Sequence, residues 1–464
     1  MIAGNYGFLT LISVLLVHGL AVLSHQANAQ GIKKKPSFIS NLGNLEIFNQ
    51  GGSEESPTAN KIAEPAPKEA VATPSSLPSP PSQNAQAKKE GVMTDEELEF
   101  LLFGSIDEVG LPETESKEND FIELAESKSW LPSVSASVGF GVSDNPMYGP
   151  YIRESSTYME FETEIFLLRQ ANPDYLSYFY FYGEGKRFLE VDEHKLSGIL
   201  LVQGEHSYRP KNSPGSGGLK LRHTYYDQAF DFSDLGLPFS MQVQSNKSEI
   251  IPHFGYQLTP KIKLSAETAF GIDRYDNPSE NNSDQKIQVN LTAKQSEQTT
   301  LHAKIFHHTI RYVERKKKDG DGTNLSDGNL RTKKIGISGS WEKQSKNPWL
   351  DTVGAELKYS QLTDNAGAYY DYSKISAKLS HEIKGEKWKS VSKLGWANYF
   401  YDIRSVTPDA QFERQSYGVD LLVTRKISSD WETYFKWRYE EDQSNARDYE
   451  YYTNFWALGV KWEN

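Results

Sequence analysis

Three absences limit what this 464-residue chain can be. It contains no cysteine, which excludes disulfide bonds, thiolate metal sites and a lipid anchor on cysteine. It has no excess of positive charge, because its formal net charge is −12, and this balance argues against nucleic acid as a partner. Past its N-terminus it lacks any apolar run of the roughly 18 residues that a membrane helix needs. Any later membrane crossing must therefore be made by strands.

Hydrophobic residues are also scarce, at 37% of the chain, whereas aromatic residues reach 12% and include 26 tyrosines and 9 tryptophans. This combination is unusual for a protein with a large buried core. It is expected of a barrel that has one face in lipid, one wet face and aromatic girdles at the membrane boundaries.

The N-terminus has the pattern of an export signal: an apolar run over residues 8–23 is followed by Ala27, Asn28 and Ala29. Small residues at these positions are what a signal peptidase reads, so residues 1–29 are predicted to be a signal peptide cleaved before Gln30. No Lys or Arg precedes the apolar run, and an uncleaved membrane anchor is the alternative.

Residues 30–93 are rich in Pro, Ser, Ala, Lys and Glu. Such a segment buries too little apolar surface to offset its ordering entropy, so it is predicted to be a disordered periplasmic linker. Within 94–129, Thr94 and Glu97 form a capping box, and leucines follow at helical spacing. We expect a short helix near 94–103 and an acidic loop up to 129. This helix could plug a pore, dock on a partner, or do neither.

From Trp130 onward the hydrophobic period changes to two: Val134, Ala136 and Val138 alternate with serines. This alternation places one set of side chains on each face of a strand. It recurs to the C-terminus in sixteen segments, each long enough to cross the hydrocarbon. The region 231–250 is ambiguous and could hold another short strand. The predicted strands lie near 133–143, 156–168, 175–186, 195–207, 217–230, 247–258, 261–273, 285–295, 298–312, 331–344, 350–363, 371–384, 388–402, 411–426, 430–443 and 449–463.

The connections between these segments differ in length. Those after even-numbered segments are mostly tight, and those after odd-numbered segments are longer and more polar, as in 144–155, 231–246, 274–284, 313–330 and 403–410. Short turns at one rim and long loops at the other are typical of outer-membrane barrels. We therefore predict an all-β fold, a transmembrane antiparallel β-barrel of about sixteen strands over 130–464, with a disordered N-terminal arm. An even strand count places the arm and the C-terminus on one side, the periplasm of a bacterial cell.

Closure of such a barrel follows from the lipid, which cannot hydrogen-bond to unpaired backbone groups. Sixteen strands enclose a lumen too wide for side chains alone to fill. The inward set is predicted to be polar and of both charge signs, which is compatible with water. Its members include Lys263, Glu267, Lys286, Gln288, Asn290, Glu356, Lys358, Lys378, Lys436 and Arg438.

Aromatic residues gather at opposite ends of the predicted strands. Amphipathic rings prefer the two membrane–water boundaries, so two belts are expected of a spanning barrel. One belt, near the short turns and the C-terminus, contains Trp349, Trp388, Trp431 and Trp462; the other contains Tyr369, Tyr399, Tyr439 and Tyr451.

Few patterns suggest a metal, cofactor or reaction. Asp319, Asp321, Thr323 and Asp327 place oxygen atoms at intervals along one loop, as a calcium site would, but they lack the full EF-hand pattern, and a solvated loop is the alternative. The run 315–318, Arg-Lys-Lys-Lys, could contact lipid phosphates at the outer rim or be a solvated loop end.

His302 and His308 share one face of a strand at a separation too large for one metal ion, and His307 points the other way. No nucleophile–base arrangement or phosphate-binding loop is supported by a motif. We predict no enzyme activity, no metal and no cofactor.

The stretch 135–146, Ser-Ala-Ser-Val-Gly-Phe-Gly-Val-Ser-Asp-Asn-Pro, resembles the first hairpin of a loose family of bacterial outer-membrane β-barrel proteins. That family includes barrels such as surface lipoprotein assembly modifiers and polysaccharide-export porins. The arm of this chain carries no helical repeat like theirs. The resemblance implies outer-membrane lipid and the barrel-assembly machinery as partners, with a periplasmic partner of the arm as a further possibility.

The pattern thus favours an outer-membrane barrel, first of all a porin-like channel for small solutes. One alternative is an export or surface-assembly barrel that works with a periplasmic partner. A structural barrel that tethers the envelope through its arm is another. A secreted, soluble β-protein that binds glycans is the alternative without a membrane.

Overall fold

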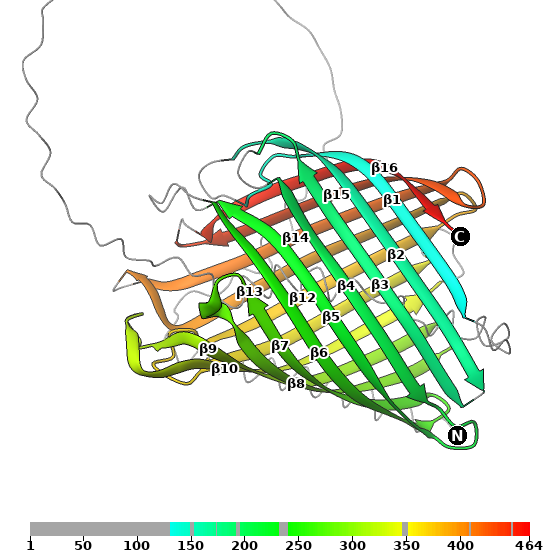
Figure 1. Ribbon diagram of the computed structural model, residues 1–464, viewed down its shortest axis with the longest axis horizontal. Coiled ribbons are helices and arrows are strands. Elements are labelled where there is room, and N and C mark those ends of the chain that lie inside the picture. The colour runs from blue at the N-terminus through cyan, green and yellow to red at the C-terminus, as the bar shows by residue number, and fades with distance from the viewer. Residues whose placement is uncertain are drawn as a thin grey trace, which may run out of the picture. The chain divides into compact units, whose positions relative to one another are not determined.

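The computed structural model describes residues 130–148, 153–172, 174–191, 195–231, 240–345, 351–407, 410–446 and 449–464 (Figure 1). The predicted signal peptide, linker and helix, over 1–129, lie outside these residues and remain predictions. Among the described residues, no helix is long and apolar enough to cross a bilayer.

The described part of the chain forms sixteen strands and a single-turn 3₁₀ helix, which confirms the predicted strand count. In the ambiguous region 231–250, residue 231 ends one of these strands and residues 240–250 begin the next, and both strands are longer than predicted. The elements are β1 (Leu131–Ser143), β2 (Ser156–Asn172), β3 (Tyr175–Phe188), β4 (Leu196–Tyr208), β5 (Gly215–Asp231), β6 (Ser240–Thr259), β7 (Ile262–Tyr275), η2 (Pro278–Glu280), β8 (Asn282–Ser296), β9 (Thr299–Lys318), β10 (Asn324–Gln344), β11 (Thr352–Asp364), β12 (Tyr372–Lys384), β13 (Trp388–Thr407), β14 (Ala410–Lys426), β15 (Trp431–Ser444) and β16 (Tyr451–Glu463).

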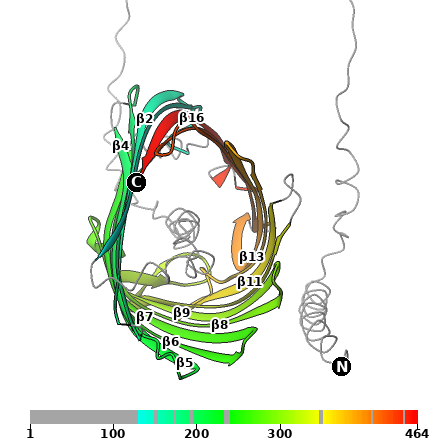
Figure 2. The same cartoon turned by 90° about the vertical axis from the view of Figure 1, so that its right-hand side faces the viewer.

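Each strand pairs antiparallel with the next one along the chain, and β1 pairs with β16 to close the barrel (Figures 1 and 2). The closing pair runs in continuous register from Ser135 opposite Glu463 to Ser143 opposite Phe455. A closed ring has no edge strand, so its backbone N–H and C=O groups pair within the wall. This is the arrangement that lipid requires.

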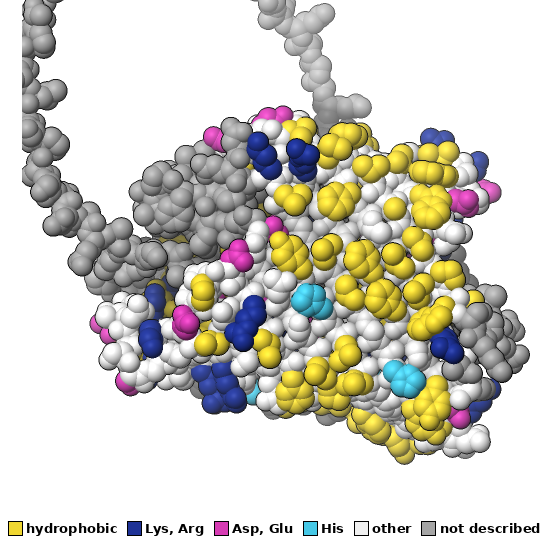
Figure 3. Space-filling model, in the orientation of Figure 1, with side chains coloured by type: hydrophobic (Ala, Val, Ile, Leu, Met, Phe, Trp, Pro, Cys, Tyr) yellow, Lys and Arg dark blue, Asp and Glu magenta, His cyan; other side chains and the backbone are white. Residues whose placement is uncertain are grey.

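The two faces of the wall differ as the period-two pattern predicts. Outward side chains are apolar and exposed: Phe140 and Leu458 are each 64% exposed, and Ile335 is 58% exposed. On the inward face of β10, the polar side chains of Thr332, Lys334 and Ser338 are buried, with Lys334 at 6%. Figure 3 shows hydrophobic side chains spread over the outside of the wall. The fold is therefore a transmembrane antiparallel β-barrel, with its apolar side outward.

At one rim, the predicted connection 144–155 matches the interval between β1 and β2, but another predicted long loop is mostly strand. Residues 313–330 were expected to form a loop, but β9 continues to Lys318 and β10 begins at Asn324, so only 319–323 turn. Pairing there is irregular, with register shifts on both sides of Asn329. The prediction was wrong because the side chains of these strand extensions are mostly polar on both faces, so the segment lacks the apolar alternation by which strands are recognised.

Small residues on β1 and β16 allow large side chains to lie across the closing seam. A Cβ added to Gly139 would collide with the Tyr434 hydroxyl and lie 2.9 Å from the Leu458 carbonyl oxygen. A Cβ added to Gly141 would collide with the Tyr158 ring. The two tyrosines come from β15 and β2, the strands on either side of the seam. These glycines therefore leave room for inward rings that cover the closing pair.

The two polar residues that follow β1, Asp144 and Asn145, form hydrogen bonds with β16. The Asp144 carboxylate accepts hydrogen bonds from the backbone N–H and the side-chain amide of Asn454, both at 2.7 Å. The Asn145 amide donates to the Tyr452 carbonyl at 3.0 Å. The segment that resembles a first barrel hairpin is thus the segment that fastens the first strand to the last.

The seam generates a stability prediction. Gly139→Ala should destabilise the barrel by about 1–3 kcal/mol, because the new methyl group overpacks the space under Tyr434. The measurement is urea unfolding of the full chain refolded in lipid vesicles. Gly418→Ala is the matched control, because a Cβ at Gly418 meets no atom within 4 Å. Equal stability of the two variants would contradict this account of the seam.

Candidate functional site: the charged interior

The barrel encloses a cavity of about 1000 Å³. Its lining includes five of the ten residues that the sequence placed in the lumen: Glu356, Lys358, Lys378, Lys436 and Arg438. The walls of this cavity are the candidate functional site, because a pore would present these side chains to its solute.

The other five predicted lumen residues lie on the same inward face of β7 and β8. Glu267 forms an ion pair with Lys220 of β5 at 3.4 Å. The ammonium of Lys286 lies 5.9 Å from the centre of the Phe306 ring, which Lys358 also approaches, at 5.2 Å. The remaining members of the set are placed by cross-strand register and contacts: Lys263 opposite Thr292, Gln288 opposite Glu267, and Asn290 opposite Ser265.

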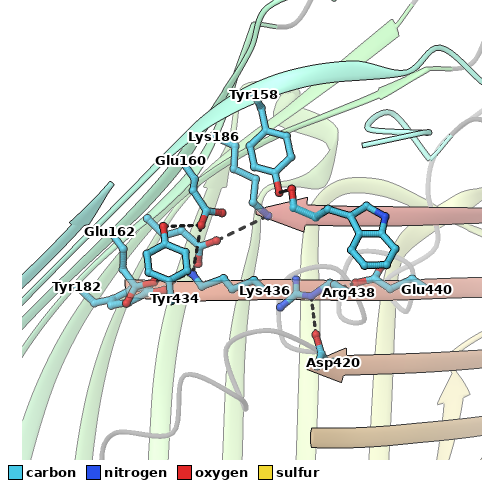
Figure 4. A network of polar contacts seen from close by, with 12 residues as sticks. Tyr158, Glu160, Glu162, Tyr182, Lys186, Asp420, Tyr434, Lys436, Arg438 and Glu440 are labelled. Atoms are coloured by element: carbon cyan, nitrogen blue, oxygen red, sulfur yellow. Dashed lines mark hydrogen bonds and ion pairs between the residues drawn. The ribbon is translucent and has the colours of Figure 1, made fainter. Parts of the chain in front are cut away.

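One arc of the cavity wall, from β14 through the seam to β3, is predominantly acidic. Tyr434 of β15 donates a hydrogen bond of 2.7 Å to the Glu160 carboxylate of β2, across the two seam strands. Lys436 of β15 reaches the same side, with its ammonium 3.3 Å from Glu162 and 3.7 Å from Glu160. Figure 4 shows these side chains converging over the seam. The network links β15 to β2 by side chains as well as through the backbone ladder.

The rest of this arc consists of paired charges. Arg438 lies 2.8 Å from Asp420 and 3.8 Å from Glu440, and Lys186 lies 3.8 Å from Glu184. The cavity-lining residues of β14, β15, β2 and β3 include five carboxylates and three basic side chains. This arc is therefore net negative.

The adjoining arc, from β9 to β13, is basic. Lys374 donates a hydrogen bond of 2.6 Å to the Tyr399 hydroxyl, and Lys358 packs against Phe306. The cavity-lining residues of this arc hold six lysines against two glutamates: Lys304, Lys334, Lys358, Lys374, Lys378 and Lys393 with Glu342 and Glu356. The interior thus carries charges of both signs, segregated into two arcs.

Sequence reasoning identified several basic residues of the lumen but missed most of the acidic arc. The signal was present: Glu160, Glu162 and Glu164 recur at period two on β2. Which of the two faces was inward depends on the closed wall, and the partners of these carboxylates come from strands more than 250 residues away along the chain.

Aromatic residues fill the interior at the end of the barrel from which the β9–β10 hairpin extends, here called the rim of the extended hairpins. Tyr399 is 1% exposed and belongs to a buried cluster with Tyr372, Tyr401 and Phe412. Arg404 lies over the Phe412 ring, 4.4 Å from its centre. These side chains narrow the lumen from the inside instead of facing lipid.

The structure therefore corrects part of the predicted tyrosine belt, which contained Tyr369, Tyr399, Tyr439 and Tyr451. Tyr399 lies in the internal cluster, and Tyr451 packs edge-to-face against Tyr148, at 5.4 Å between ring centres, beside the inward Asp442. Tyr369 is half-buried against the same internal cluster. Tyr439 faces outward, since it shares a cross-strand row with the exposed Leu394 through Val419. Position at a strand end does not reveal which face a ring occupies.

The described members of the predicted tryptophan belt lie at the short-turn ends of their strands. Trp388 and Trp431 are 53% and 48% exposed at the first residues of β13 and β15. Trp462 is half-buried beside Trp431, its register partner on β15. Trp349 lies outside the described residues, and its place in the belt remains a prediction.

The proposed calcium residues are engaged in the hairpin turn itself. The Asp319 carboxylate accepts hydrogen bonds from the backbone N–H groups of Asp321 and Thr323, at 3.1 and 2.8 Å. Asp327 pairs with Lys317 at 3.0 Å. Over the described ranges, no group of three or more His, Cys, Asp or Glu side chains is arranged to hold a metal.

The histidines of β9 are likewise held by neighbours. His302 hydrogen-bonds to Thr292 at 3.1 Å, and His308 to Asp284 at 3.0 Å.

Side chains of the basic run 315–318 also pair with neighbouring residues of the barrel. Arg315 is buried, pairs with Glu280 at 3.0 Å and lies over the Tyr370 ring, so it does not face a lipid surface.

No protein-family model matches this chain, and no curated protein matches it in sequence. Solved structures share its general shape at low identity. OccAB1 of Acinetobacter baumannii is 10% identical, with 74% of this chain and 99% of that one covered and a TM-score of 0.40. OmpT, an outer membrane protein of Vibrio cholerae, is 11% identical, with 73% and 99% covered and a TM-score of 0.36. A bacterial polysaccharide outer membrane secretin is 7% identical, with 71% and 98% covered and a TM-score of 0.39. Likenesses this distant carry no argument about function.

At the rim of the internal aromatic cluster, a turn brings carboxylates together outside the membrane-spanning wall. The Asp371 carboxylate accepts a hydrogen bond of 2.6 Å from the Asp364 backbone N–H. Burial, together with the negative charges of Asp364 and Asp402, raises the pKa of Asp371 to about 6, although that hydrogen bond acts in the opposite direction. Since the folded pKa exceeds the unfolded one, the folded turn binds the proton more tightly, and its stability increases as pH falls from 7 through 6.

Amide hydrogen exchange across 365–371 should therefore become slower, after correction for intrinsic rates, when the pH is lowered from 7 to 5. Asp371→Asn keeps the acceptor oxygen and removes the charge, so it should show the slow exchange at both pH values. Asp327→Asn is the control, because Lys317 lowers the pKa of Asp327 and its charge does not change in this range. Protection of the 365–371 amides that is independent of pH in the unmodified chain would refute the assignment.

Proposed function

We propose that this chain is a porin-like channel of the bacterial outer membrane that passes small polar solutes, charged ones included. The observation that carries the proposal is the cavity of about 1000 Å³ inside a closed barrel, lined by two adjoining arcs of opposite net charge. Polar side chains of both signs hold water in a lumen that is too wide to be packed dry.

The segregation of charge has a consequence for the solutes. An anion entering the cavity is attracted to the lysines of β9–β13, and a cation to the carboxylates near the seam. A solute that carries both charges is oriented between the two arcs. Because the signs nearly balance over the whole lining, the channel should select weakly between small anions and cations, and more strongly by size.

The apolar outer surface of the barrel wall supports a location in the outer membrane. Its outward face is apolar on nearly every strand, as the exposure of Phe140, Ile335 and Leu458 illustrates. A surface of this extent is unfavourable in water and favourable in lipid. The predicted signal peptide, over 1–29, is consistent with export, and the N-terminal arm and C-terminus would then lie in the periplasm.

Planar-bilayer recording of the full refolded chain tests the proposal. We expect discrete conductance steps and a small reversal potential in a salt gradient. The triple variant Lys304→Gln, Lys358→Gln and Lys393→Gln should shift that potential clearly toward cation selectivity, because it removes half of the lysines in the basic arc.

The matched control removes three lysines from the short turns: Lys261→Gln, Lys387→Gln and Lys426→Gln. These side chains are exposed, and salt screens such charges beyond a Debye length of about 10 Å at 0.1 M ionic strength. The control should therefore leave the reversal potential nearly unchanged. Absence of conductance in the unmodified chain, or equal shifts in the two triple variants, would contradict the proposed function.

A further inference from the structure

A group of cations lies on the outside of the wall, where no sequence motif marks it. On β10, Arg331 and Lys333 continue the outward row of Ile335 and Ile337, as the alternation of exposed and buried residues along this strand indicates. On β9, Arg311 lies on the same face as the exposed Ile305. These three side chains form the basic outer patch.

A fourth cation extends the patch along the rim. Arg274 follows the exposed Ile272 by two residues on β7, and is itself exposed. On β8, between β7 and β9, Ser283 pairs in register with Ile272 on one side and Arg311 on the other. The outward rows of β7, β9 and β10 thus change from apolar to cationic toward the same end of the barrel, the rim of the extended hairpins. Figure 3 shows Lys and Arg side chains beyond the hydrophobic band toward this end.

The placement of the two central arginines is unfavourable without an anion. Arg311 and Arg331 are direct cross-strand partners, and like charges directly opposite each other destabilise a sheet. Neither forms an ion pair or side-chain hydrogen bond with any described residue, and the Nε atom of Arg331 is buried without a hydrogen-bond partner. Glu314, the acidic neighbour further along β9, is exposed and forms no ion pair with them among the described residues.

We propose that the basic outer patch, Arg274, Arg311, Arg331 and Lys333, binds the phosphate groups of a lipid headgroup at this face of the membrane. Guanidinium groups match phosphate oxygens in charge and in planar donor geometry, and Arg–phosphate hydrogen bonds are among the strong ones. A phosphate between Arg311 and Arg331 would neutralise their repulsion and accept hydrogen bonds from the terminal nitrogens of their guanidinium groups. The lipid is the expected source, because the patch is continuous with the apolar surface that the acyl chains cover.

The proposed lipid contact is therefore at the basic outer patch and not at the run 315–318, which the sequence suggested. The run 315–318 drew attention as four consecutive cations, but Arg315 and Lys317 are paired with Glu280 and Asp327. The basic outer patch instead combines four cations from three strands, one from β7, one from β9 and two from β10, which only the register of the barrel brings together.

The test uses the full chain purified in an uncharged detergent, with lipid A as the phosphorylated probe and its dephosphorylated form as the matched lipid. We expect binding and thermal stabilisation by lipid A and much less by the dephosphorylated lipid. The double variant Arg311→Gln and Arg331→Gln should bind lipid A at least about tenfold more weakly, since hydrogen bonds to charged groups contribute about 1.5–3 kcal/mol.

The same variant supplies a second readout of opposite sign. In uncharged detergent without lipid A, it should be as stable as the unmodified chain or more stable, because the unfavourable Arg–Arg pair is gone. The control is Lys316→Gln with Lys317→Gln, further along β9 in the same hairpin, which removes the same charge and should retain lipid A binding.

Three results would overturn the proposal: equal binding of the two lipids by the unmodified chain, equal loss in the control, or loss of stability of the double variant before any lipid is added. Inhibition by inorganic phosphate without any preference between the lipids would identify a free-anion site instead of a headgroup site. The outcome is independent of conductance, so it separates this inference from the proposed channel function.

Discussion

Backbone hydrogen bonding in a solvent that offers none is the constraint on which the rest of this structure depends. In lipid, each unpaired N–H or C=O group costs several kcal/mol, so the first strand must pair with the last. The pairing of β1 with β16 meets that requirement, and side chains reinforce it. Asp144 and Asn145 bond to β16, and Tyr434 and Lys436 reach Glu160 over glycines that leave them room. Closure is thus secured by the ladder and by an inward network that crosses it.

Once the wall is closed, its two faces meet different solvents, and the chemistry of each follows. The outward face needs apolar side chains in the centre and tolerates cations only where lipid headgroups can reach them. The inward face can hold many charges, because water and opposite charges surround them. In the acidic arc those charges pair across strands, as Arg438 of β15 does with Asp420 of β14, whereas β9–β13 present a basic arc. The same closed wall therefore accounts for the membrane surface, the candidate lumen and the basic outer patch.

The fold was largely predictable, because period-two alternation is a local property that each strand displays by itself. The strand count and the inward position of residues such as Lys358 depend only on that property. Three features depended on more. The hairpin of β9 and β10 was mistaken for a loop because both of its faces are polar. Tyr399 was assigned to lipid because strand position does not specify the face of a ring. The network of Glu160 and the basic outer patch each combine residues from different strands, and only the register shows which ones lie together.

The most direct test of the central claim is to measure, residue by residue along one strand, whether the side chain contacts lipid or water. The chain contains no cysteine, so single cysteines can be introduced one at a time from 334 to 341 on β10 in the full protein and labelled in lipid vesicles. The account predicts contact of labels with a lipid-borne quencher at 335, 337, 339 and 341, and reaction with a water-soluble thiol reagent at the intervening positions. The reverse pattern, or uniform access along the strand, would contradict a closed barrel with its apolar face in lipid.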